Sequence, residues 1–194
     1  MEPINNLEQL NVYLNKTPLF IDSISVFKKD FELTFPTSTA YGNFKKLTRY
    51  FPKILFKNEQ AEIIPGIGEC SPLNLPYYNS ESSETVNTAL KYIIKSLKSN
   101  KEPITDIYSF KKNYDWIVGH NIAKCGIEGA YWTALSYLHR EPIKNLWGGT
   151  RKKVEAGVSI GIEDRIDNIL IKVHIAVDRR NAKRVKVKIK PGKD

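Results

Sequence analysis

The segment from residue 154 to residue 190 constrains the fold most, because it combines two kinds of periodicity in a short stretch. Residues 154–162 and 185–189 each predict a strand. Between them, apolar residues recur at helical spacing: Ile166, Ile169, Leu170, Val173 and Val177. Asn181 is a residue type that often ends a helix in the left-handed conformation. Two strands joined by a crossover helix lie parallel, so the segment predicts one βαβ unit with a right-handed connection.

The preceding part predicts a different architecture. Extended patterns cover residues 31–35, 50–56 and 63–69, separated by polar turns, which is typical of an antiparallel meander. Pro52 lacks a backbone donor, so we expect a bulge or an edge strand there.

Two helices are expected to pack on this sheet, at about residues 81–99 and 121–139. The first has one apolar stripe, and Asn79 or Ser80 can cap its start. The second ends before Pro142. A glycine-rich turn at residues 147–151 marks a domain boundary, and residues 1–20 form a short lead.

The positive charge is concentrated near the end of the sequence. The chain of 194 residues has a net charge of +9; residues 1–100 contribute +1 and residues 101–194 contribute +8. Residues 179–194 alone hold eight basic groups and one acidic group. Three explanations stay open: a nucleic-acid-binding tail, a solvated helix end and strand, or a domain that continues beyond this segment. The basic stretch has no interleaved aromatic residues, which disfavours nucleic-acid binding.

Several classes of protein are excluded by composition. The chain is 41% hydrophobic and 26% charged, which is typical of a globular protein rather than a disordered one. No apolar run is long enough for a transmembrane helix, and the start lacks the features of a secretory signal. Cys70 and Cys125 are far apart and lack metal-site spacing. We therefore expect a cytoplasmic protein without a membrane partner.

The second strand of the βαβ segment carries three alternating lysines. Because strand side chains alternate, Lys186, Lys188 and Lys190 share one face. Such a face either lines a polar cavity, where a lysine suits general-base chemistry, or is a wet edge of the sheet.

The first strand presents a face of small residues. Gly157, Ser159 and Gly161 alternate with larger apolar residues. Ser159 could hydrogen-bond a ligand, or the small residues could simply let a neighbouring side chain approach.

Several motifs together resemble one known family. In order along the chain they are residues 66–70, 119–128, 147–149, 157–162 and 186–192. This combination resembles the enolase superfamily, in the muconate-lactonizing-enzyme-like branch that holds o-succinylbenzoate synthases and N-acylamino acid racemases. The resemblance covers residues 21–194.

The resemblance implies an α+β capping domain, residues 21–150, followed by the first βαβ unit of a truncated (β/α)₈ TIM-type barrel, residues 151–194. Residues 1–20 do not match the start of the family. It also implies that Lys188 is the acid/base residue, that Lys186 acts beside it, and that Ser159 faces the substrate.

Two loops of the capping domain would close over a small carboxylate substrate in such a protein. They lie around residues 35–41 and 70–78, which suggests that Thr37 and Tyr41 contact the substrate. Family members bind Mg²⁺ through acidic residues on the third, fourth and fifth barrel strands, and a second lysine comes from the sixth. A complete barrel needs about 250 residues. We therefore expect the metal ligands to be absent from this chain, and the partner to be a missing barrel or further copies in a homo-oligomer.

The activity implied is that of an o-succinylbenzoate synthase, which removes a proton next to a carboxylate and then water in menaquinone biosynthesis. An N-acylamino acid racemase of the same branch is the first alternative, because the same lysines serve both reactions. A capping-domain fragment without catalytic activity and a nucleic-acid binder are the others.

Overall fold

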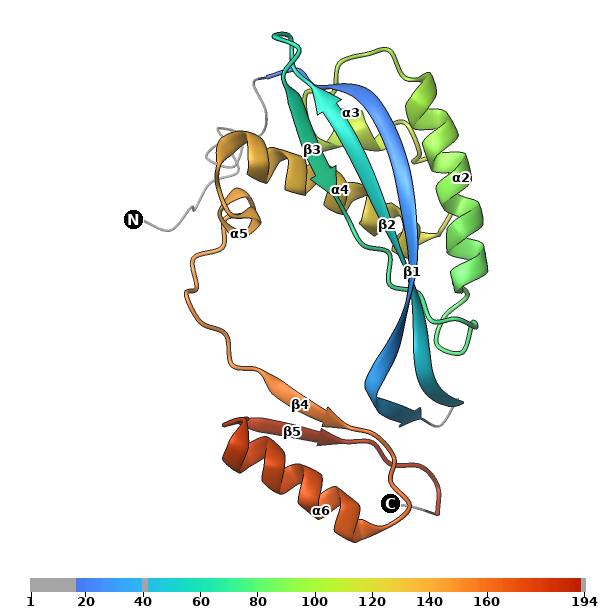
Figure 1. Cartoon of the computed structure of the whole chain (residues 1–194), viewed down its shortest axis with the longest axis vertical. Coiled ribbons are helices and arrows are strands. Elements are labelled where there is room, and N and C mark those ends of the chain that lie inside the picture. Colours follow the sequence, from blue (N-terminus) through green and yellow to red (C-terminus); the bar gives the residue numbers. More distant parts are fainter. Residues whose placement is uncertain (1–16, 40–41, 193–194) are drawn as a thin grey trace. The chain divides into compact units, whose positions relative to one another are not determined.

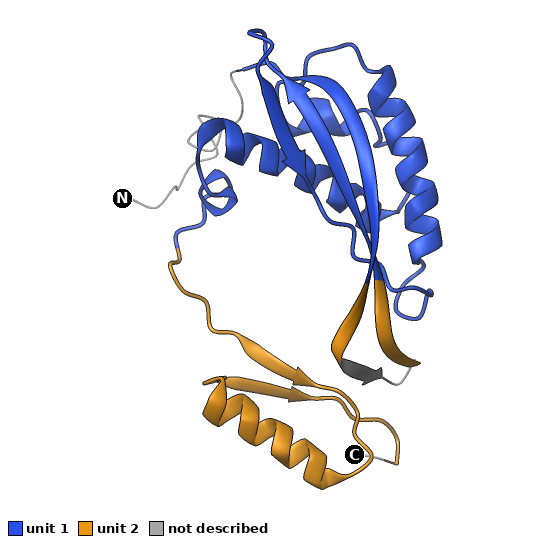
Figure 2. Ribbon diagram, in the orientation of Figure 1, with its two compact units in different colours: residues 1–30, 48–150 blue, residues 31–47, 151–194 orange. Residues whose placement is uncertain are grey.

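The computed structural model describes residues 17–39 and 42–192, and the side chains of residues 35–39 are not included. The chain divides into two compact units (Figure 2). One comprises residues 1–30 and 48–150, and the other comprises residues 31–47 and 151–194.

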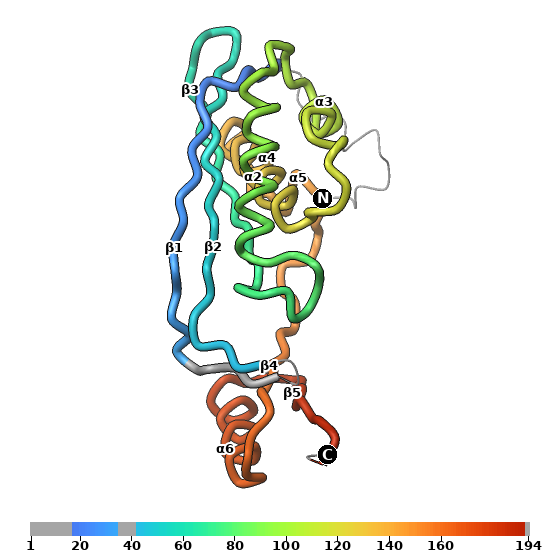
Figure 3. The backbone as a smooth tube through the Cα atoms, turned by 90° about the vertical axis from the view of Figure 1, so that its right-hand side faces the viewer, coloured from blue at the N-terminus to red at the C-terminus, as the bar shows by residue number. Residues whose placement is uncertain are grey.

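The first unit is built on most of a three-stranded sheet in the order β1-β2-β3, with bounds β1 (Phe20–Thr39), β2 (Gly42–Lys57) and β3 (Ile63–Ile67). The parts of β1 and β2 within residues 31–47 belong to the second unit. β3 runs antiparallel to β2, with Ile67 opposite Lys53. Four helices lie along one face of the sheet (Figures 1 and 3): α2 (Ser83–Ser99), α3 (Ile107–Lys111), α4 (Asn121–His139) and α5 (Ile143–Leu146). The predicted antiparallel sheet covered by helices is confirmed.

β2 faces the helices with every second residue. Its buried positions are Thr48, Tyr50, Pro52, Ile54 and Phe56, which is the period of a strand with one covered face. The prediction of a bulge or an edge at Pro52 is wrong, because β2 is the middle strand and its register to the β3 side is constant from the Tyr50–Cys70 bridge to Lys57 opposite Ile63.

A central strand tolerates this proline because its carbonyl still accepts a bond from the Gly68 amide at 2.9 Å. Pro52 has no N–H, so one hydrogen bond of the sheet is lost at this position. The loss falls just beyond the end of β3 at Ile67 and leaves the ladder between β2 and β3 intact.

The two predicted helices form close to the expected bounds. α2 is capped by Ser82, whose hydroxyl accepts from the Thr85 amide in a capping box, rather than by Asn79 or Ser80. Asn79 instead accepts a hydrogen bond from the Glu81 amide at 2.9 Å.

Helix α4 packs unusually close to the chain around β3. A Cβ atom added at Gly68 would lie 1.8 Å from the Gly126 carbonyl oxygen, and one added at Gly66 would lie 2.0 Å from the Ala130 carbonyl oxygen. Only glycine fits at such an approach. Behind this contact an aromatic cluster of Phe56, Phe110 and Tyr131 fills the core, with Phe110 stacked on Tyr131 at 5.1 Å between ring centroids.

The second unit contains the βαβ segment. Strand β4 (Gly157–Ile160) is followed by helix α6 (Ile166–His174), a π-helical turn η1 (Ile175–Arg179) and strand β5 (Arg184–Val187). β4 and β5 pair in parallel, as predicted, and Asn181 has the positive φ of 49° that a left-handed helix stop requires. Both strands are shorter than expected, and the flanking Val154 and Ile189 are exposed.

None of the helices in the described part of the chain has the length and apolar character needed to cross a membrane.

Candidate active site

The parallel pair β4–β5 brings three of the predicted site residues to one face. Ser159 lies opposite Lys186 in the register. Lys188 is two residues further along and therefore points to the same side as Lys186. Its amide donates to the Ile160 carbonyl at 3.0 Å, so the backbone at Lys188 is still held by β4.

The opposite face of the same pair is the packed one. Along β4 and β5, apolar residues alternate with exposed ones. The apolar set is half-buried or buried and consists of Val158, Ile160, Val185 and Val187, of which Ile160 is almost completely buried. Helix α6 contacts β4. Within this segment, Ser159 and Lys186 are exposed to solvent and Lys188 is half-buried. The apolar face fixes the orientation of the strands, and this leaves the polar face free for ligand chemistry.

The carboxyl ends of two parallel strands lie at the same edge, which is where barrel and open-sheet enzymes place their sites. After β4 the chain carries Glu163, whose side chain is largely buried and forms an ion pair with Lys172 of α6. This ion pair was not expected from the sequence, and it ties the chain after β4 to helix α6.

A metal ion is not accommodated by this part of the molecule. Within residues 17–39 and 42–192 there is no group of three or more His, Cys, Asp or Glu side chains that could hold one. The residues present therefore do not fit Mg²⁺, and carboxylates from elsewhere would be needed.

The predicted capping-loop residues are not both described. Thr37 lies in strand β1, but its side chain is not among those described, and Tyr41 lies outside the described residues.

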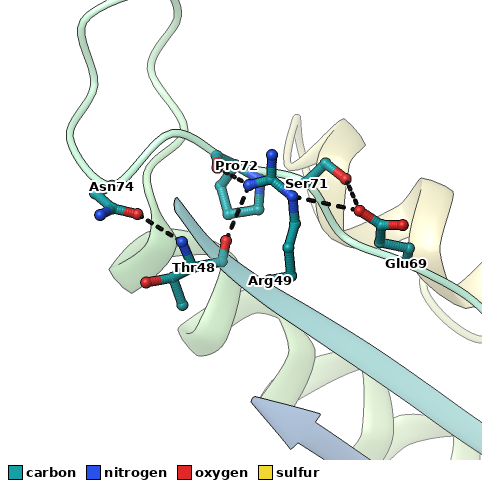
Figure 4. A network of polar contacts seen from close by, with 6 residues as sticks. All are labelled: Thr48, Arg49, Glu69, Ser71, Pro72 and Asn74. Carbon is teal, nitrogen blue, oxygen red and sulfur yellow. Dashed lines mark hydrogen bonds and ion pairs between the residues drawn. The ribbon is translucent and has the colours of Figure 1, made fainter. Parts of the chain in front are cut away.

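The second capping loop is held by a polar network around Arg49 on strand β2 (Figure 4). The Arg49 guanidinium donates to the Pro72 carbonyl at 2.9 Å and to the Thr48 carbonyl at 3.1 Å, and its Nε lies 3.3 Å from Glu69 Oε1. The same carboxylate oxygen accepts from the Ser71 hydroxyl at 2.6 Å. Sequence reasoning found the loop but not these contacts.

The far end of that loop caps helix α4. The His120 position at the start of α4 has no side-chain cap, and the Glu81 carboxylate supplies one by accepting from the Ile122 amide at 3.0 and 3.2 Å. A carboxylate at a helix N-terminus is favoured both by the hydrogen bonds and by the helix dipole.

Cys70, where the loop begins, is a buried thiol. Its sulfur lies near the Ala123 carbonyl of α4, at 3.8 Å. Burial raises its pKa to about 12, so the thiol is a packing group and not a nucleophile at neutral pH.

Comparison with known proteins identifies the relatives of this chain. No family model matches. An o-succinylbenzoate synthase from Geobacillus kaustophilus is 33% identical over 165 residues, which are 84% of this chain and 42% of the relative. An N-succinylamino acid racemase from Amycolatopsis is 27% identical over 179 residues, 90% of this chain and 45% of the relative.

Solved structures agree with the fold. A member of the enolase superfamily from Listeria innocua superimposes with a TM-score of 0.78 at 27% identity, over 91% of this chain and 46% of that one. A dipeptide epimerase from Enterococcus faecalis, solved with Mg and a dipeptide, has the same fold at 16% identity with a TM-score of 0.69, over 88% of this chain and 46% of that one. The chain thus spans less than half the length of the relatives it matches.

The sheet covered by helices, the parallel βαβ segment and these likenesses lead to one family. The chain belongs to the enolase superfamily, in the branch of the o-succinylbenzoate synthases and N-succinylamino acid racemases, and corresponds to the N-terminal portion of its members.

Proposed function

We propose that this chain forms the N-terminal part of an o-succinylbenzoate synthase. The observation that carries the proposal is the shared face of Ser159, Lys186 and Lys188 on two neighbouring parallel strands. The synthase from Geobacillus kaustophilus, at 33% identity, supports this choice of reaction.

In this proposal Lys188 is the base. Its amine removes the proton from the carbon next to the substrate carboxylate. The Lys188 ammonium then gives that proton to the hydroxyl group on the adjacent carbon, whose C–O bond breaks to release water. The Lys186 ammonium, one step back on the same face, favours the negative charge that develops on the carboxylate. Ser159 would donate a hydrogen bond that orients the substrate. The Mg²⁺ that the resemblance implies would supply charge stabilisation there, and carboxylates that this chain does not contain would have to hold it.

We assign residues 21–150 to the capping domain and residues 151–194 to the start of the barrel. Thr37, Tyr41 and the loop that follows β3 would then contact the substrate. Their task is selection and exclusion of water rather than proton transfer.

Racemisation of an N-acylamino acid is the second candidate, favoured by the likeness to the Amycolatopsis racemase. Lys188 would remove the α-proton in the same way, and a second base would return a proton to the opposite face. No water would be lost, so product analysis separates the two reactions.

The direct test is a fusion enzyme in which residues 1–192 of this chain replace the matching segment of the Geobacillus kaustophilus synthase. Assayed with Mg²⁺, it is expected to form o-succinylbenzoate well above the buffer rate. A folded fusion that racemises N-succinylamino acids but does not dehydrate would favour the second candidate, and one that does neither would refute the proposal.

The 194-residue chain by itself is expected to be inactive in both assays. Two strands do not close a barrel, and the described residues provide no metal site to balance the developing charge. Turnover by this chain that is lost on Lys188→Ala would contradict the expectation. A non-catalytic role through association would instead predict that the fusion enzyme, too, lacks activity.

A further inference from the structure

We propose that Glu163 and Lys172 are positioning residues of the βαβ segment. Their ion pair holds residues 161–165, here called the β4–α6 connection, at the edge of the strand pair where Lys188 lies. It also keeps the Glu163 carboxylate from pairing with the Lys188 ammonium. This inference rests on the proposed function, because it assigns a task to two residues near the proposed base.

The β4–α6 connection begins beside Lys188. Strands β4 and β5 both end on the side of the pair from which α6 starts (Figure 1). The Lys188 amide donates to the Ile160 carbonyl at 3.0 Å, and continuation of the parallel register places Gly161 opposite Lys188.

Glu163 lies two residues beyond Gly161 and is within reach of Lys188. Neighbouring strands are about 4.8 Å apart and two residues span at most about 7 Å, so the Cα atoms of Glu163 and Lys188 lie within about 12 Å of each other. A glutamate and a lysine side chain are long enough to meet across that distance.

The ion pair directs the Glu163 carboxylate to helix α6 instead. Its partner is Lys172, in the second turn of that helix. The Glu163 side chain is 18% exposed and the Lys172 side chain is 43% exposed. A carboxylate with so little access to water needs a partner in the protein. The β4–α6 connection therefore opens only by breaking a charged hydrogen bond.

The charged groups around Lys188 come from its own chain segment, from the connection and from α6. They are Lys186 and Lys190 on its own segment, Glu163, Asp164 and Arg165 in the connection, and Asp167 and Lys172 on α6. Arg165 and Asp167 pair with each other at 2.8 Å, and Asp164 is exposed to solvent, where its charge is screened. Glu163 is thus the half-buried carboxylate whose release would matter most.

Release of Glu163 would weaken the proposed base. A carboxylate beside Lys188 favours its ammonium form, which cannot accept a proton from the substrate. With Lys172 in place, the charge of Glu163 is balanced within the connection. Loss of Lys172 should therefore change the pH dependence of the reaction and not only loosen the chain, which distinguishes this proposal from a purely structural ion pair.

The first test measures the holding role in the folded fusion enzyme, by hydrogen exchange of the β4–α6 connection. Lys172→Met and Glu163→Gln are expected to raise the exchange rate about ten-fold, since a charged hydrogen bond is lost. Arg165→Gln is the matched control, because it also removes one positive charge from an ion pair, but the two side chains of that pair are exposed by 75% and 59%. Equal rates in Lys172→Met and in the control would contradict the holding role.

The second test measures kcat/KM for the dehydration as a function of pH in the same fusion enzyme. Lys172→Met is expected to move the acidic limb of the profile upward by about 0.5–1 pH unit, which lowers kcat/KM near neutral pH about three- to ten-fold. Adding Glu163→Gln to Lys172→Met removes the released carboxylate. The limb should then return to within about 0.2 unit of its original position, although the connection still exchanges fast. Arg165→Gln should leave the limb in place.

An acidic limb that stays in place in Lys172→Met would overturn the inference, and so would one that the double substitution does not bring back. In either case the ion pair would be structural only. A folded, unsubstituted fusion that does not dehydrate refutes the proposed function instead. The exchange rates then still decide whether the ion pair holds the connection.

Discussion

The first unit has an extensive buried apolar core, and the βαβ segment has almost none. In the first unit Phe56, Ile93 and Tyr131 are completely buried between the sheet and its helices. Of the βαβ segment only Ile160 and Ala176 are buried, and the apolar stripe of α6 is exposed, with Ile166 at 66% and Leu170 at 59%.

The difference shows what periodicity does and does not decide. Both α2 and α6 have an apolar stripe, and both form helices. Burial needs a second layer of structure, and a two-stranded sheet with one helix supplies little of it. The first unit is therefore expected to unfold cooperatively on its own core, whereas the βαβ segment adds little stability. The predictions below test this contrast.

Gly68→Ala should have the largest effect. The new methyl group would lie 1.8 Å from the Gly126 carbonyl oxygen, so helix α4 must move away from β3, at a cost of roughly 4 kcal/mol or more in the free energy of unfolding. Urea denaturation followed by tryptophan fluorescence measures it.

Gly129→Ala, on the same helix α4, is the matched control. Its methyl group would meet only the Gly68 Cα at 3.4 Å, an ordinary contact. It should leave stability unchanged or raise it by up to about 1 kcal/mol through helix propensity. A similar loss in both variants would mean that the close approach is not what makes Gly68 necessary.

A pair of large-to-small substitutions compares the two regions directly. Ile54→Ala, at a completely buried position of β2, should cost about 2–5 kcal/mol. Leu170→Ala on α6 should change stability by less than about 0.5 kcal/mol, because the side chain is already in water. Equal costs, measured by denaturation of the two variants, would show that α6 is packed more tightly than its exposure indicates.

Alkaline pH should weaken the first unit and not the βαβ segment. Burial raises the pKa of Cys70 from 9.0 to about 12, and it also raises the pKa of Tyr114 and Tyr131. In each case the neutral form is favoured in the folded protein, so stability is full below the pKa of the unfolded chain and falls as the pH rises toward the folded value. Residues 151–192 contain no tyrosine or cysteine.

The measurement is the urea midpoint between pH 8 and pH 11. It should fall above about pH 9. Cys70→Ala should make the decline shallower. A flat profile, or a decline that Cys70→Ala leaves unchanged, would contradict this explanation.

Tyr131→Phe should have the smallest effect. The Tyr131 hydroxyl is buried and has no hydrogen-bond partner among the described residues. Its removal is expected to leave stability unchanged or to raise it by up to about 1 kcal/mol, while the ring keeps its stacking on Phe110. Loss of more than that amount in a thermal melt would mean that the hydroxyl makes a bond in solution.

Local patterns predicted much of this fold. The apolar stripes gave α2 and α4 nearly their observed bounds, and the strand–helix–strand order gave the parallel pairing of β4 with β5. Alternation along each strand also predicted which residues share a face: Ser159 on β4, and Lys186 and Lys188 at β5. Parallel pairing of the two strands then brings these residues to the same side of the sheet.

The contacts that the sequence did not reveal join distant residues. Arg49 and Glu69 are 20 positions apart, and Glu81 and Ile122 are 41 apart. No periodicity links such pairs. The prediction for Pro52 was wrong because the effect of a proline in a strand depends on where the neighbouring strand ends. The predicted cap of α2 was wrong because Asn79, Ser80 and Ser82 are all good capping residues and lie within four positions of each other.

The role of Lys188 is the central claim, and one comparison of rates tests it most directly. In the fusion enzyme, Lys188→Ala should lower the dehydration rate by about 10²–10⁴-fold, the usual contribution of a positioned base, and Lys186→Ala should lower it less. Lys190 lies three residues beyond the end of β5 and is exposed, whereas the Lys188 amide still bonds to the Ile160 carbonyl of β4. Lys190→Ala should therefore retain nearly the full rate. A folded Lys188→Ala enzyme that keeps a rate similar to that of Lys190→Ala would contradict the account.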